Sequence, residues 1–156
     1  MPAKKTKSKA STDAIAMLKQ DHEKVRGLLD RLEKASGARR TKLLTQVEQE
    51  LKVHTQIEEE IFYPAYRDAA RKKDDKKLYF EALEEHHVVD LVLPEMNDGD
   101  TAEALKAKAK VLKELVEHHA DEEEKEMFPR ARKALGRDEL RELGERIEAR
   151  KEQLSR

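Results

Sequence analysis

The chain has 156 residues, a length that suits one domain of ordinary size. Lys and Arg number 33 and Asp and Glu number 34, so the net charge is near neutral although charged residues make up 43% of the chain. Few Gly, Pro and aromatic residues argue against sheet-based folds, and the absence of Cys excludes disulfides, thiolate metal sites and a cysteine nucleophile. Ala, Glu, Lys, Arg and Leu exceed half of the residues, so we expect an all-α protein.

The longest apolar run is Ala14–Leu18, which is far too short to span a membrane, so we expect a cytoplasmic protein. Residues 1–11 carry Lys residues interspersed with small residues, and no long apolar segment follows them. We therefore expect a disordered basic tail at 1–11 and one domain at 12–156. Because no basic patch with aromatic residues appears, we expect no nucleic-acid partner.

Apolar residues recur at steps of three and four along five segments, which predicts five helices. The first runs from about Thr12 to Ala35, with Ser11 or Thr12 as its cap and Gly37 as its end. The second begins near Arg40 and carries apolar residues on one stripe.

Pro64 is expected near the end of the second helix, and the charged stretch 71–75 is expected to be a connection. The third helix runs from about Lys76 to Met96, and Pro94 should kink it or end it early. Residues 97–100, Asn-Asp-Gly-Asp, form the clearest turn in the sequence.

Thr101 can cap the fourth helix, which then meets Pro129, and Gly136 precedes a short fifth helix. Short connections between long amphipathic helices favour antiparallel neighbours. The sequence therefore predicts an up-down-up-down four-helix bundle with a short C-terminal fifth helix that packs across the outside or over one end.

The second and fourth helices share a local pattern, His-x-x-x-Glu-Glu followed by an aromatic residue and Pro. A shift of 65 residues superposes Val47, Leu51, His54, Glu58, Glu59 and Pro64 on Leu112, Val116, His119, Glu123, Glu124 and Pro129. Two copies are too few for a solenoid. They fit a bundle with approximate twofold symmetry about a central site.

All six histidines lie in the long predicted helices, namely His22, His54, His86, His87, His118 and His119. A His and a Glu four residues later share one helical face and can bind one metal ion. Two such pairs, with His from the other two helices, can bind two ions with the carboxylates bridging. Imidazole and carboxylate ligands without thiolate suit iron, manganese or zinc. Without a cation, burial of these groups would cost several kcal/mol.

Four pieces of sequence occur in order: Asp21-His22; His54 to Glu59 with Phe62-Tyr63-Pro64; Glu84-Glu85-His86; and His119 to Glu124 with Phe128-Pro129. With these pieces the chain resembles the bacterial hemerythrin-like proteins, the HHE cation-binding family, over about residues 14–153. The resemblance implies a four-helix bundle with a non-haem di-iron centre in its core. Carried over residue by residue, it implies as metal ligands His22, His54, His86 and His119, with Glu58 and Glu123 bridging the two irons.

The third helix departs from the oxygen-carrying hemerythrins, which have His-x-x-x-His there. The residue four positions after His86 is Asp90, so the fifth histidine is absent. Six ligands shared by two ions leave positions for water, hydroxide, dioxygen, nitric oxide or peroxide. This departure counts against reversible oxygen carriage and favours oxidant, nitric oxide or iron-linked roles.

The two histidine doublets leave alternatives, because His118 with Glu122 and His119 with Glu123 have the same spacing. Internal symmetry favours His119, which lies ten residues before a proline, as His54 does. In the third helix, His86 follows an apolar stripe through Tyr79 and Leu83, but His87 has a rival stripe through Phe80, Leu83 and Leu91. The alternative ligands are therefore His87, Asp90, His118 and Glu122.

The expected function is that of a di-iron protein that binds or responds to dioxygen, nitric oxide or peroxide. One alternative is a di-iron enzyme with peroxide-consuming or oxidase activity, and another is a metal-free helical interaction module. A binding protein is favoured over a dedicated enzyme, since no motif for hydrolytic or phosphoryl-transfer chemistry occurs. The sequence does not specify a protein partner.

Overall fold

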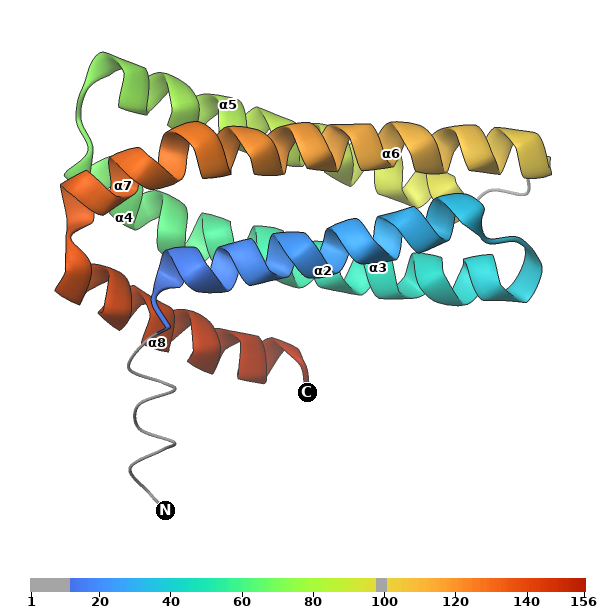
Figure 1. Ribbon diagram of the computed structural model, residues 1–156, viewed down its shortest axis with the longest axis horizontal. Coiled ribbons are helices and arrows are strands. Elements are labelled where there is room, and N and C mark those ends of the chain that lie inside the picture. Colours follow the sequence, from blue (N-terminus) through green and yellow to red (C-terminus); the bar gives the residue numbers. More distant parts are fainter. Residues whose placement is uncertain (1–11, 98–100) are drawn as a thin grey trace.

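The computed structural model describes residues 12–97 and 101–156, and these ranges contain helices and short turns without strands (Figure 1). Four long helical rods lie antiparallel, and a shorter helix packs on one side of them. This arrangement confirms the predicted all-α class and bundle. The predicted tail at 1–11 and positions 98–100 of the predicted turn at 97–100 lie outside the described residues.

Each rod is one helix or a chain of helical segments. The first rod is α2 (Ala14–Lys34), and the second joins α3 (Gly37–Ile57), the π-helix η1 (Glu58–Phe62) and α4 (Tyr63–Ala69). The third joins α5 (Lys73–Val92) and the 3₁₀ helix η2 (Leu93–Asn97), and the fourth joins α6 (Ala102–Glu122), the π-helix η3 (Glu123–Met127) and α7 (Phe128–Leu135). Helix α8 (Arg137–Leu154) completes the fold.

The second and fourth rods contain the same wide turn at positions 65 residues apart. The N–H of Tyr63 donates to the carbonyl of Glu58, and the N–H of Phe128 donates to the carbonyl of Glu123. Each bond spans five residues and defines a π-turn, a feature that often accompanies functional sites. The internal repeat of the sequence therefore has a structural counterpart.

Pro64 lies in the last segment of the second rod, near its end as predicted, but the proline does not itself end the rod, which continues to Ala69. Pro64 and Pro129 each lie in the first turn after a π-turn. A proline is tolerated in the first turn of a helix because its missing N–H is not needed there.

Two predicted boundaries in the hairpin of α2 and α3 are wrong. Asp13 caps α2 in place of Thr12, since its carboxylate accepts a 2.8 Å hydrogen bond from the N–H of Ala16. Helix α2 ends at Lys34, and Gly37 is the first residue of α3 with a φ of 59°. This left-handed conformation suits glycine. The second helix begins at this residue, before the predicted start near Arg40.

The stretch 71–75 is only partly a connection, because α5 begins at Lys73. Asp75 turns into the protein and is buried. Its carboxylate accepts hydrogen bonds from the Tyr66 hydroxyl at 2.9 Å and from Arg130 at 3.2 Å. These partners compensate the buried charge and anchor the start of α5 to the second and fourth rods.

Two predicted helix ends are confirmed. Helix α5 gives way to the 3₁₀ helix that contains Pro94. Thr101 caps α6, where its hydroxyl accepts a 3.2 Å hydrogen bond from the N–H of Ala104.

The buried apolar residues form two clusters along the bundle. One cluster, near α4, α7 and α8, includes Ile15, Leu18, Phe62, Tyr66, Phe128 and Ile147. The other, toward the opposite end, includes Leu29, Leu32, Leu44, Val47, Leu112 and Val116. Along the rods, the buried histidines and glutamates lie between residues of one cluster and residues of the other, so a polar layer separates two apolar regions.

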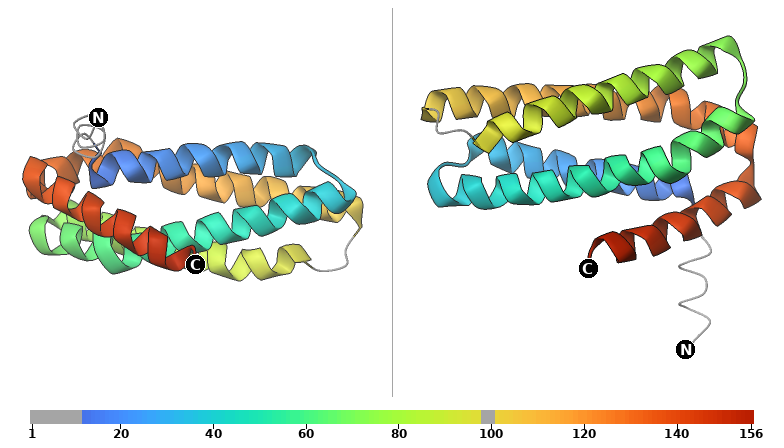
Figure 2. Two further views of the ribbon diagram at one scale, coloured as in Figure 1. Left: turned by 90° about the horizontal axis from the view of Figure 1, so that it is seen from below. Right: turned by 180° about the vertical axis from the view of Figure 1, so that it is seen from behind.

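Helix α8 lies across the outside of the bundle against α2, α3, η1 and α7 (Figure 2). Its residues Leu140, Leu143 and Ile147 are buried, as the apolar spacing predicts. None of the helices in the described ranges has the length and apolar character needed to cross a membrane.

Gly144 sets the close approach of α8 to the start of α2. A Cβ atom there would lie 3.1 Å from backbone atoms of Thr12, Asp13 and Ala14. We expect Gly144→Ala to lower the free energy of unfolding by about 1–2 kcal/mol, because backbone atoms cannot rotate away. Thermal and urea denaturation of the purified variant measure this loss.

Gly27 provides the matched control in the middle of α2. A Cβ atom there would meet only the end of the Arg31 side chain at 3.9 Å. Gly27→Ala should stabilise the protein by about 0.5–1 kcal/mol through helix propensity. If Gly144→Ala were equally stabilising, the close packing of α8 on α2 would be refuted.

Candidate metal centre

The structure brings the six principal candidate ligands together in the polar layer of the bundle. The six are buried: His22, His54, Glu58, His86, His119 and Glu123. They come from all four rods, and both glutamates are the first residues of the π-turns. Their donor atoms form two groups in which all atoms lie within 4.8 Å of one another.

The first group consists of His22, His54, Glu58 and Glu123. The Nε2 atom of His22 lies 3.1 Å from Oε1 of Glu123, and Nε2 of His54 lies 3.3 Å from Oε1 of Glu58. Among the described residues, both Nε2 atoms, Oε2 of Glu58 and Oε1 of Glu123 are buried without a hydrogen-bond partner. The close pairs are thus not aligned as hydrogen bonds, and four donor atoms converge on one space.

The second group consists of Glu58, His86 and His119. The Nε2 atoms of the two imidazoles are 3.1 Å apart, and Oε1 of Glu58 lies 3.0 Å from Nε2 of His86. Oε2 of Glu123 lies 3.5 Å from Nε2 of His119. Both carboxylates therefore contact imidazoles of both groups, which is the position of a bridging ligand.

Every one of the four imidazoles is oriented by a carboxylate at its outer nitrogen. The Nδ1–H group of His22 donates to Glu124 at 2.7 Å, and that of His54 donates to Asp21 at 2.8 Å. The Nδ1–H group of His86 donates to Glu59 at 2.7 Å, and that of His119 donates to Glu85 at 2.6 Å. These bonds fix the tautomer, so that each Nε2 atom faces the interior. Carboxylate, imidazole and metal are commonly linked in this order in metalloproteins.

The buried charges balance one another through shifted pKa values. Burial disfavours the charged form of His54, but the charge of Glu58 and the hydrogen bond to Asp21 outweigh it and raise its pKa to about 10. Burial likewise opposes protonation of His119, yet Glu123 raises its pKa well above the usual range. Burial raises the pKa of Glu58, but the neighbouring imidazoles, with His54 foremost, lower it well below its ordinary value. Without a metal, protons on His54, His86 and His119 offset the negative charge of the carboxylates.

Tyr63, which belongs to the Phe62-Tyr63-Pro64 motif, adds a polar atom to the centre that was not predicted from the sequence. Its hydroxyl lies 2.5 Å from Oε2 of Glu123 and 3.1 Å from Oε1 of Glu58. It also lies 3.2 Å from Nε2 of both His86 and His119. Burial, then Glu123 and Glu58, raise the pKa of Tyr63 well above its ordinary value, so the phenol keeps its proton. The π-turn at Glu58 directs both side chains into the same space.

The four alternative ligands do not join the buried groups. His87 and Asp90 are exposed on α5. The side chain of His118 is 68% exposed, and with Glu85 and Glu122 it forms a separate group on the surface. The structure thus brings His86 and His119, rather than His87 and His118, into the centre.

The predicted inner stripe of the third helix is partly wrong. Tyr79 and Leu83 are only half-buried, whereas Leu78, Ala82 and Val89 face the core with His86. This register could not be recognised from apolar spacing alone, because the buried face of α5 begins with a charged residue, Asp75.

The carboxylates that bind the Nδ1 atoms were also missed as site residues. Glu59 and Glu124 are equivalent in the internal repeat, and Asp21 and Glu85 each precede a ligand-candidate histidine. Those two regularities were the available signal. On a helix, however, consecutive residues point in different directions, so the sequence did not indicate that Asp21 contacts the histidine of a neighbouring helix.

Comparisons with known proteins identify the family to which this chain is similar. The family model of the hemerythrin HHE cation-binding domain matches residues 13–131. Proteins described as uncharacterised from Mycobacterium tuberculosis and Mycobacterium bovis are 30% identical over 145 residues, which cover 91% of this chain and 87% of each relative. The crystal structure of a hemerythrin HHE cation-binding domain-containing protein from Mycobacterium kansasii, a homologue of Rv2633c, matches with a TM-score of 0.79 and 31% identity, over 92% of this chain and 87% of that one.

Binding of Zn²⁺ to metal-free protein at pH 7 should release protons, because His54, with a pKa of about 10, must lose its proton before Nε2 binds a cation. Calorimetric titration in two buffers of different ionisation enthalpy measures the number released. We expect about one proton or more per chain, and an affinity that rises with pH up to about 10. His118→Ala should not change the number, whereas zero protons from the unmodified chain would contradict the charge balance.

The same shift gives the metal-free fold a pH dependence. The pKa of His54 rises on folding from 6.5 to about 10, so its contribution to stability is complete below pH 6.5 and is lost as the pH rises through 10.

Proposed function

Because the chain belongs to the hemerythrin HHE cation-binding family, we propose that its bundle core binds two iron ions and that this centre binds or responds to dioxygen, nitric oxide or peroxide. His22 and His54 would hold one ion, and His86 and His119 would hold the other. Glu58 and Glu123, which contact imidazoles of both groups, would be shared between them. Manganese or zinc could occupy the same ligands, since imidazole and carboxylate donors suit all three metals.

One observation carries the proposal: buried donor atoms converge without hydrogen-bond partners among the described residues. The Nε2 atoms of His22 and His54 face carboxylate oxygens of Glu58 and Glu123 in this way. Buried polar atoms in native proteins are nearly always hydrogen-bonded, and exceptions need an explanation. A cation among these atoms supplies the missing interaction and replaces the protons that otherwise balance the carboxylates.

The chain itself would position the ions and control what reaches them. The outer carboxylates hold each imidazole in one tautomer, and apolar clusters on both sides limit the entry of water. When bound, the iron supplies the capacity to coordinate and exchange electrons with a small oxidant. The missing fifth histidine at Asp90 leaves more positions for such a ligand than an oxygen carrier has.

Anaerobic titration of metal-free protein with Fe²⁺, followed by elemental analysis, tests the proposal. We expect saturation at about two ions per chain, given two separate ligand groups with shared carboxylates. His86→Ala and His119→Ala should each lower the iron content, because each removes a buried donor.

The histidine doublets provide matched controls for these variants. His87→Ala and His118→Ala remove the exposed neighbours and should leave the iron content unchanged. Saturation at zero or one ion per chain would defeat the di-iron proposal. Iron loss in the His118 variant but not in the His119 variant would refute the ligand assignment.

Peroxide turnover is the second candidate function, and Tyr63 is the observation that favours it. Its phenol keeps a proton beside both carboxylates and is within 3.2 Å of two imidazole nitrogens. A proton donor at that place suits the disproportionation of two hydrogen peroxide molecules to two water molecules and one dioxygen, in which the second peroxide supplies the electrons and the oxygen that leaves as water must be protonated.

If Tyr63 supplies this proton, Tyr63→Phe should lower the rate of hydrogen peroxide consumption by about 100-fold while iron content stays unchanged. An oxygen electrode and elemental analysis give the two readouts. Tyr66→Phe is the control, because Tyr66 bonds Asp75 outside the centre. If the iron-loaded, unmodified chain consumed no peroxide, only the binding role would stand.

A further inference from the structure

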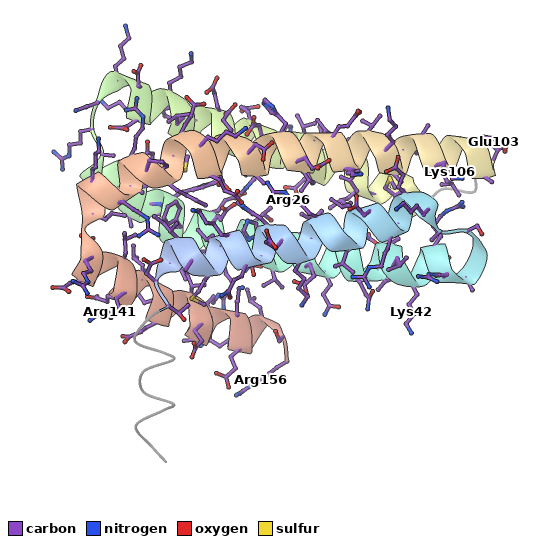
Figure 3. The ribbon with its side chains drawn as sticks, in the orientation of Figure 1. Arg26, Lys42, Glu103, Lys106, Arg141 and Arg156 are labelled. Atoms are coloured by element: carbon purple, nitrogen blue, oxygen red, sulfur yellow. The ribbon has the colours of Figure 1, made fainter. Side chains whose placement is uncertain are left out.

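The four carboxylates that orient the imidazoles form two unlike pairs. Asp21 and Glu124, the carboxylates that orient the two imidazoles of the first group, each also contact a cation. Lys151 forms an ion pair with Oδ1 of Asp21, whose other oxygen binds His54. Nη1 of Arg26 lies 3.3 Å from the Glu124 oxygen that binds His22. Figure 3 places Arg26 between α2 and α6.

Glu59 and Glu85, the carboxylates that orient the two imidazoles of the second group, differ in this respect. In the part of the chain that the structure describes, no Lys or Arg forms an ion pair with Glu59 or Glu85. The side chain of Glu59 is 44% exposed, and Glu85 faces the exposed imidazole of His118. Acidic neighbours reinforce the difference, since burial and then the charges of Glu85 and Glu81 raise the pKa of Glu122.

Lys151 comes from a helix that contributes no candidate ligand to the centre. Helix α8 begins at Arg137, beyond the residues 13–131 that match the family model. A pocket of about 310 Å³ opens beside Lys151, and Asp21 and His54 also line it. The next residue toward the N-terminus, Arg150, pairs instead with Glu60 at 2.9 Å.

A carboxylate on Nδ1 strengthens an imidazole as a ligand, because it draws the N–H proton outward. A cation on that carboxylate offsets its charge and also repels a metal ion nearby. We propose that Lys151 and Arg26 weaken divalent-cation binding at the first group, so that the two metal positions are electrostatically unequal. Lys151 is then a positioning residue, through which α8 tunes a centre that it does not line. This inference rests on the proposed two-ion site.

Competition titrations of the full metal-free chain with Zn²⁺ and a chromophoric chelator test the inference through two stepwise binding constants. Lys151→Met should tighten one step, by the order of 10-fold. Lys151→Arg should restore the original constants, because it restores the positive charge. Glu59→Gln removes the negative charge beside Nδ1 of His86. This variant should weaken the other binding step by a similar factor.

Arg150→Gln is the matched control, since it removes a contact of α8 with η1 but no charge from Asp21. It should leave both constants unchanged. If Lys151 only held α8 in place, Lys151→Met would weaken binding or leave it unchanged, and either result would overturn the inference. Lys151→Gln provides a second test of the same sign should the Met variant fold poorly.

The titration distinguishes a failure of the proposed two-ion site from a failure of the proposed effect of Lys151. If the unmodified chain bound fewer than two Zn²⁺ ions, the proposed two-ion site would fail, and this inference with it. If it bound two ions and Lys151→Met tightened neither step, only the inference would fail.

Discussion

The bundle depends on one constraint: two carboxylates and four imidazoles are buried in its core and must balance one another. Glu58 and Glu123 are almost fully buried, and an isolated ionised carboxylate at that depth would cost several kcal/mol. Each therefore lies against imidazoles from more than one rod. Because these partners come from all four rods, the balance holds only when the whole bundle has assembled in one register.

The outer carboxylates extend this constraint to the surface. Each Nδ1 atom binds an acid, and two of the four acids bind a cation in turn. Chains of charge thus run from the core to Arg26 and Lys151 on one side but end at exposed Glu59 and half-buried Glu85 on the other. Approximate twofold symmetry in the backbone, marked by the paired π-turns, therefore coexists with asymmetry in charge.

Much of the fold followed from the sequence, because apolar spacing and caps are local properties. The caps at Thr101 and the break at Pro94 are confirmed by short-range bonds and helix geometry. The π-turns were not foreseen, since a proline after a helix normally indicates an end. Their cause is tertiary: the wide turn lets Glu58 and Tyr63 point into the same space.

The candidate site was predictable where the internal repeat constrained it. His54, Glu58, His119 and Glu123 occupy equivalent places in the two copies, and the structure brings them into the polar layer. The roles of Asp21 and Lys151 could not be predicted from the sequence. Asp21 contacts His54, 33 residues away on another helix, and Lys151 contacts Asp21 from 130 residues away. Such contacts depend on how helices rotate against one another, which no local pattern records.

Two metal ions held between shared carboxylates in the buried layer would be visible by anomalous diffraction at the iron absorption edge, from crystals of the iron-loaded chain. We expect two peaks, one among His22, His54 and the two glutamates and one beside His86 and His119. A single peak at the surface group of Glu85, His118 and Glu122, with none in the core, would contradict this expectation.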